Sequence, residues 1–106
     1  SPVAGQTFEA FVIEELIKGL NATMTTGWED SYYRTKNGAE VDLILEGDFG
    51  VLPVEITFGI ATDRRRLNSL KLFLRDNNLP LGIVINNSDT VAMLSDNIIQ
   101  IPAGLL

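Results

Sequence analysis

Two acidic residues, Asp42 and Glu55, stand in otherwise apolar stretches of the sequence and are the residues best suited to chemistry. Strand side chains alternate between faces, so neighbouring strands over 39–45 and 51–58 would direct both carboxyl groups to one side. Two adjacent carboxylates are unfavourable unless one is protonated or a cation neutralises them. Oxygen ligands favour Mg²⁺ or Mn²⁺, and we expect the Ile56 carbonyl and water molecules to complete the shell.

The composition excludes most other kinds of site. The chain contains no histidine and no cysteine. This rules out, within these 106 residues, a Ser-His-Asp triad, a zinc site with histidine or thiolate ligands, and disulfides. The net charge of −6 argues against tight nonspecific binding of nucleic acid by the domain alone. No apolar run reaches the roughly 20 residues that a membrane span needs, and we expect a soluble, cytoplasmic protein.

A simpler interpretation of the acidic pair is a set of solvated charges on the polar face of a half-exposed sheet. The flanking residues of Glu55, Val54 and Ile56, favour partial burial of its charge instead.

The hydrophobic patterns predict an α/β domain with a mixed sheet flanked by helices. The helix over 8–20 has apolar residues near helical spacing, with Thr7 as its N-cap. The run over 81–85 is continuously apolar, which is typical of a buried central strand. The expected order is helix, three strands, helix, strand and two short edge strands, over residues 8–20, 31–35, 39–45, 51–58, 63–76, 81–85, 91–94 and 98–101.

This α-β-β-β-α-β order, with the two carboxylates on its second and third strands, resembles the PD-(D/E)XK nuclease superfamily. It implies a restriction-endonuclease-like core. More narrowly, the segments resemble the family named domain of unknown function 4143, which lies at the C-terminal end of AAA-type ATPase chains. The segments that carry this resemblance are Thr7-Phe8-Glu9, Tyr33-Arg34-Thr35-Lys36, Glu40-Val41-Asp42 and Pro53-Val54-Glu55. It implies that residues 1–106 are one domain from a longer ATPase chain, with ATP bound only upstream.

The resemblance assigns Asp42 and Glu55 to the metal and places Glu9 on the first helix, facing the site. Alternatively, Glu9 is an N-terminal-turn glutamate stabilised by the helix dipole. Glu40 has no direct place in the pattern and is expected to be solvated or to pair with Arg34 across the hairpin. Thr57 stands where the superfamily has a catalytic lysine. A positioned proton-transfer group contributes roughly 10²–10⁴-fold in rate, so its loss predicts weak or absent catalysis.

Basic residues on the second helix offer two alternatives. Arg64 or Lys71 could reach the site as a relocated cation, and Arg64, Arg65 and Lys71 could contact nucleic-acid phosphates. Otherwise the basic residues form an exposed helix face, some of them paired with Asp63 or Asp76. These residues are Arg64, Arg65, Arg66, Lys71 and Arg75.

Together these features predict a nuclease-like domain attached to an ATPase, weakly active or inactive. The alternatives from another class are a non-catalytic regulatory or oligomerisation module and a nucleic-acid-binding platform. The expected partners are the chain's own ATPase domain, with DNA or RNA as candidates, no membrane, and an oligomer as an open possibility.

Overall fold

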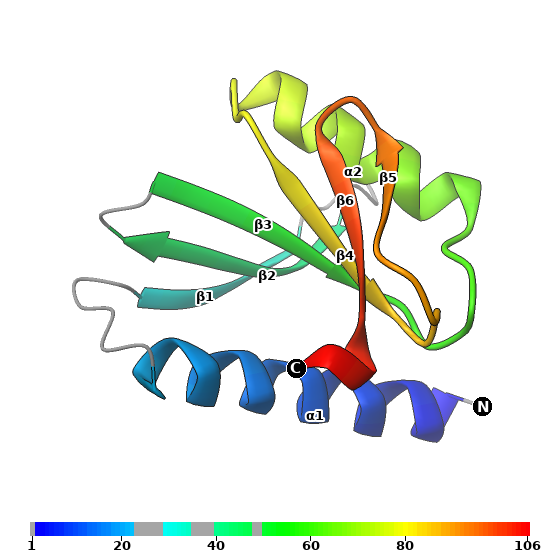
Figure 1. The fold of residues 1–106 in the computed structure, drawn as a ribbon. Helices are drawn as coiled ribbons and strands as arrows, with labels where there is room; N and C mark the ends of the chain where they lie inside the picture. Colours follow the sequence, from blue (N-terminus) through cyan, green and yellow to red (C-terminus); the bar gives the residue numbers. More distant parts are fainter. Residues whose placement is uncertain (1, 23–28, 35–39, 48–49) are drawn as a thin grey trace.

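The computed structural model describes residues 2–22, 29–34, 40–47 and 50–106. Two helices are each followed by three strands, in the expected order, and a 3₁₀ turn ends the chain (Figure 1). Their bounds are α1 (Pro2–Ala22), β1 (Glu29–Arg34), β2 (Glu40–Gly47), β3 (Gly50–Ile56), α2 (Arg64–Asp76), β4 (Gly82–Asn86), β5 (Ala92–Ser95), β6 (Ile98–Pro102) and η1 (Ala103–Leu105). The expected connection between the strands over 31–35 and 39–45 lies outside the described residues.

The strands form one mixed sheet in the order β1-β2-β3-β4-β6-β5. β1, β2 and β3 make an antiparallel meander, whereas β3, β4 and β6 run parallel to one another. The β3–β4 connection passes through α2, as parallel neighbours require a crossover. β4 therefore lies in the interior of the sheet, which confirms the expectation of an apolar central strand and of an α/β fold.

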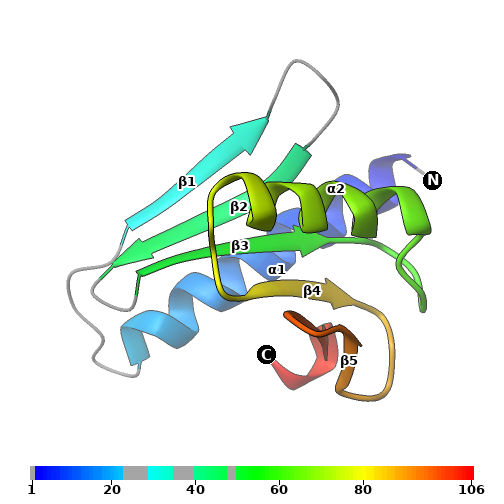
Figure 2. The ribbon, with the colours of Figure 1, turned by 90° about the horizontal axis from the view of Figure 1, so that it is seen from above.

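The two helices cover opposite faces of this sheet (Figure 2). Val12 and Ile13 of α1 pack on an aliphatic layer from the central strands. That layer contains Leu43, Leu45, Val54, Ile56 and Ile85.

α2 packs its apolar stripe on the other face of the sheet. Leu70, Phe73 and Leu74 are its buried residues. A Cβ at Gly82 would lie 3.2 Å from a methyl carbon of Leu74 and 3.3 Å from one of Leu70, so glycine allows the helix to approach β4 closely. The side chain of Asp63 caps α2 by accepting a hydrogen bond from Arg66 N, as expected.

The structure corrects three details. α1 begins at Pro2 and not after a Thr7 cap, because proline is well accommodated in the first turn of a helix. β3 ends at Ile56, two residues earlier than expected, although Thr57 N still donates to Ile85 O at 2.9 Å. Val41 belongs to the cluster under α2, whereas alternation with Leu43 predicts the α1 side. No helix in the described part of the chain is long and apolar enough to cross a membrane.

Candidate carboxylate site

The β2–β3 hairpin brings Asp42 and Glu55 together. Leu43 pairs with Val54, so the two acidic residues are the next positions on adjacent strands and share the face opposite α1. Asp42 is 7% exposed and Glu55 2% exposed. The interpretation as solvated surface charges is therefore wrong, and the burial expected from the apolar neighbours of Glu55 is confirmed.

The Asp42 carboxylate is held by the backbone of β3. Its Oδ2 accepts a hydrogen bond from Ile56 N at 2.7 Å. Because the Ile56 amide donates to the Asp42 side chain, the backbone pairing of β2 with β3 ends at Leu43 and Val54. The Asp42 carboxylate is thus fixed at the point where the two strands part.

Arg66 of α2 supplies a positive charge to this pair. Its Nη1 donates to Glu55 Oε1 at 2.6 Å and lies 3.7 Å from Asp42 Oδ2. The same nitrogen donates to the Ile56 carbonyl oxygen at 3.3 Å. One guanidinium nitrogen therefore contacts the three oxygen ligands that the sequence predicts for a metal ion.

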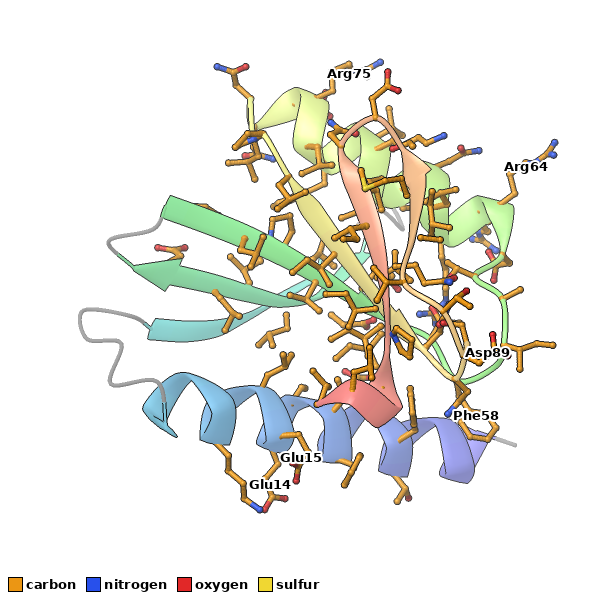
Figure 3. All side chains as sticks on the ribbon, in the orientation of Figure 1. Glu14, Glu15, Phe58, Arg64, Arg75 and Asp89 are labelled. Atoms are coloured by element: carbon orange, nitrogen blue, oxygen red, sulfur yellow. The ribbon has the colours of Figure 1, made fainter. Side chains whose placement is uncertain are left out.

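The relocated cation is thus Arg66, and neither Arg64 nor Lys71 supplies it. Arg64, Arg65 and Lys71 are exposed, and Arg64 points outward at the start of α2 (Figure 3). A signal for Arg66 was present in the sequence, because 66, 70 and 74 follow one another at four-residue intervals. Arg66 therefore lies on the helical stripe of buried Leu70 and Leu74.

Charge and burial shift the titration of the site. Burial, the negative charge of Asp42 and hydrogen bonding between the two carboxyl groups raise the pKa of Glu55 to about 9, against a smaller opposing effect of Arg66. Burial lowers the pKa of Arg66, but the attraction of Glu55 and Asp42 outweighs it, and the net pKa is raised. At neutral pH Glu55 is therefore protonated in the absence of a metal ion, and Arg66 remains positively charged.

Three buried side-chain oxygens have no hydrogen-bond partner among the described residues, and two of them, Glu55 Oε2 and Thr57 Oγ1, belong to this site. An unpartnered carboxylate oxygen beside a second carboxylate needs a proton or a cation. The donor set contains oxygen atoms alone, which suits Mg²⁺ or Mn²⁺. By these two criteria, Asp42, Glu55 and the Ile56 carbonyl fit a divalent cation.

Glu9 lies on α1, the helix that covers the other face of the sheet. Within the described residues, no group of three or more acidic, histidine or cysteine side chains is arranged to hold a metal. Asp42 and Glu55 are therefore a pair, and the role of Glu9 stays a prediction. The backbone register of β1 and β2 places Arg34 opposite Glu40, as expected.

A second buried polar group, missed in the sequence, adjoins this site. Asn86 is fully buried, and its Nδ2 donates to Gln100 Oε1 at 3.0 Å and to Thr62 Oγ1 at 3.2 Å. Its Oδ1 accepts from Ser88 N at 3.0 Å. Since Ile56 pairs with Ile85, Asn86, the last residue of β4, lies beside Thr57. The only sequence signal was a polar residue directly after the apolar run 82–85.

The loops that follow β3 and β4 are also joined directly. Gly59 N donates to Asn87 Oδ1 at 2.7 Å, and Asn87 N donates to Gly59 O at 2.7 Å. Gly59 has a φ of +137°, a conformation that favours glycine. The polar groups therefore gather at the carboxyl ends of parallel strands, where open α/β sheets place their ligand sites.

Comparison with known families adds one assignment. The family described as Domain of unknown function (DUF4143) matches residues 4–106. The chain belongs to this family. The match includes both acidic residues, Arg66 and the polar group around Asn86. No curated protein and no solved structure matches the chain.

Proposed function

We propose that this DUF4143 domain is a PD-(D/E)XK nuclease-like domain attached to an ATPase, with weak or absent phosphodiesterase activity. The observation that carries the proposal is the burial of Asp42 and Glu55 side by side at the β2–β3 divergence, next to the Ile56 carbonyl. Burying two carboxylates costs free energy unless a proton or a cation compensates their charge. This cost favours a functional site over a chance pairing of acidic residues.

The proposed roles follow from the positions of the groups. Asp42, Glu55 and the Ile56 carbonyl would hold Mg²⁺ or Mn²⁺. When bound, such an ion supplies polarisation of a phosphodiester and acidification of a water molecule. Thr57 follows Glu55 at the position of the missing lysine, and its hydroxyl can orient water but carries no charge. The exposed Arg64, Arg65 and Lys71 are available to phosphates along α2.

A second candidate function is a non-catalytic regulatory or oligomerisation module of the ATPase. The observation that favours it is the contact of Arg66 Nη1 with Glu55 Oε1 at 2.6 Å, which compensates the pair without a metal. Under this alternative the contact of Arg66 with the two acidic residues has become a structural element of the α2–sheet packing.

Cleavage of DNA and RNA with Mg²⁺ or Mn²⁺ distinguishes the two functions. For the wild-type domain we expect slow or undetectable cleavage. Thr57→Lys restores a positive charge two residues after Glu55 and is expected to raise the rate, within the roughly 10²–10⁴-fold range of a positioned acid–base group. Thr90→Lys, at an exposed threonine before β5, is the control for an added charge, and Thr57→Lys/Glu55→Ala is the control for dependence on the carboxylate.

Metal-dependent cleavage that rises with Thr57→Lys, but not with Thr90→Lys, and disappears with Glu55→Ala would support the nuclease-like site. A folded Thr57→Lys protein with no cleavage would favour the non-catalytic module. Fast cleavage by the wild-type domain would contradict the expected weak activity.

A further inference from the structure

We propose that Arg66 and a divalent cation compete for the same three oxygens, so that Arg66 is a positioning residue that sets the metal affinity of the site. This inference rests on the proposed function, because it assumes that Asp42 and Glu55 can hold a metal. It concerns a property that the sequence pattern does not contain, since Arg66 has no place among the predicted site residues.

A guanidinium nitrogen of Arg66 lies against the three oxygens that would hold a metal ion. Nη1 of Arg66 lies 2.6 Å from Glu55 Oε1, 3.7 Å from Asp42 Oδ2 and 3.3 Å from the Ile56 carbonyl oxygen. A metal ion bound to these oxygens would lie about 2.0–2.2 Å from each of them. An ion and the guanidinium nitrogen would therefore overlap in space and repel each other in charge. The oxygens can serve one cation at a time.

The partly exposed side chain of Arg66 can move away from the carboxylates into solvent. Its side chain is 45% exposed, whereas those of Asp42 and Glu55 are 7% and 3% exposed. The residue lies in the first turn of α2, and the helix is anchored by Leu70, Phe73 and Leu74. Rotation of the Arg66 side chain into solvent therefore leaves the packing of α2 unchanged.

Loss of Arg66 without a replacement cation is unfavourable for Asp42 and Glu55. With Arg66 withdrawn and no metal bound, the buried Glu55 and Asp42 would have no cation nearby in the described structure, and only the proton on Glu55 would limit their mutual repulsion. The exchange of one cation for another avoids this state. Metal binding and release of Arg66 are consequently parts of the same event.

Isothermal titration calorimetry with Mn²⁺ tests this competition. Arg66→Gln removes the competing charge and is expected to raise the Mn²⁺ association constant at least about tenfold, since one nearby charge changes proton affinity by about one to three decades. Arg66→Lys retains a cation and is expected to stay near wild type. Arg75→Gln removes the same charge from the exposed end of α2, where Arg75 contacts Asp76, and should leave Mn²⁺ affinity unchanged.

A second readout follows the guanidinium directly. In ¹⁵N NMR spectra, the Arg66 Nε–H signal, assigned by its loss in Arg66→Gln, is expected to shift when Mg²⁺ is added. The Arg75 Nε–H signal is the internal reference and should stay in place. Circular dichroism confirms that each variant keeps its fold.

The outcomes separate this inference from the proposed function. Tighter binding by Arg66→Gln, with a shift of the Arg66 signal in the wild-type domain, supports the competition. Equal or weaker binding by Arg66→Gln, with binding abolished by Asp42→Ala, overturns the competition and leaves the metal site standing. Absence of Mn²⁺ binding in both the folded wild type and Arg66→Gln overturns the metal site and, with it, the competition.

Discussion

The two faces of the central sheet differ in what they bury. Against α1, the buried layer is aliphatic, with Val12 and Ile13 on strand residues such as Leu43 and Val54. Against α2, aliphatic residues share the face with Asp42, Glu55, Asn86 and Gln100, which are the buried polar and charged residues of the described structure.

The difference follows from strand alternation on shared strands. Val54 and Ile56 face α1, and Glu55 between them faces α2. One face can therefore stabilise the sheet by apolar burial while the other accommodates charged groups. α2 itself is divided, because Arg66 meets the carboxylates and Leu70 and Leu74 meet the apolar part of the face. We therefore expect substitutions in the apolar region and in the polar region to change the free energy of unfolding by different amounts and with a different dependence on pH.

The largest effect is expected in the apolar half of α2. Leu70→Ala removes a fully buried side chain and should lower the free energy of unfolding by about 2–5 kcal/mol in urea denaturation. Leu72→Ala is the matched control on the same helix, since Leu72 is 42% exposed. Equal losses for the two variants would contradict the assignment of the buried stripe.

The next effect distinguishes the polar region by its pH dependence. The pKa of Glu55 is raised from 4.5 to about 9, so the folded state holds this proton more tightly than the unfolded state. The resulting stability is complete below pH 4.5 and is lost as the pH rises toward 9, with a slope of up to about 1.4 kcal/mol per pH unit. The groups that act on this cluster are Asp42, Arg66 and, at the helix N-cap, Asp63.

Glu55→Gln imitates the protonated acid and lacks this slope. Urea denaturation at pH 5, 6, 7 and 8 should therefore show the wild type losing stability relative to Glu55→Gln as the pH rises. A constant difference between the two proteins across this range would mean that Glu55 is ionised throughout and simply paired with Arg66.

A smaller effect is expected in the amide group beside the carboxylates. Asn86→Ala removes three hydrogen bonds, those that Asn86 makes with Gln100 Oε1, Thr62 Oγ1 and Ser88 N. The expected loss of unfolding free energy is roughly 1–3 kcal/mol. Asn97→Ala removes an amide oxygen that accepts a hydrogen bond from the partly buried Ser95 Oγ, and this substitution should cost less. If Asn97→Ala costs as much, the buried amide group has no special stabilising role.

The smallest effect has the opposite sign. Thr57→Val replaces a buried hydroxyl that has no hydrogen-bond partner among the described residues, so stability should be unchanged or rise by up to about 1 kcal/mol. Thr62→Val removes a hydroxyl that accepts from Asn86 Nδ2 and should lose about 0.5–1.5 kcal/mol. Thermal unfolding of both variants measures the difference. A matching loss in Thr57→Val would mean that its hydroxyl is hydrogen-bonded, for example to water.

Most of the fold could be predicted because its signals are local. The apolar run over 82–85 identified the interior strand, and Asp63 identified the start of α2. The acidic pair could be predicted because the spacing across a hairpin fixes which residues meet. Residue type alone could not separate Arg66 from Arg64, and the signal that does so is the four-residue spacing of Arg66 from Leu70 and Leu74.

Asn86 and Gln100 were missed for a related reason. Their contact depends on the parallel pairing of β4 with β6, and these strands are joined through β5 rather than by a tight turn. Non-local strand pairing has no signature in a short window of sequence. The early start of α1 at Pro2 was missed because the segment before Thr7 has no strong periodic pattern.

The two hydrogen bonds between Gly59 and Asn87, together with the Asp63 cap of α2, determine where this fold can tolerate changes in chain length. Ile60, which is 80% exposed, lies between these two anchors, so a residue inserted after it can bulge into solvent and leave both anchors in place. A residue inserted after Arg64 would instead turn the rest of α2 by about 100° relative to its cap. Natural and engineered insertions should therefore be accepted after Ile60 and rejected a few residues later.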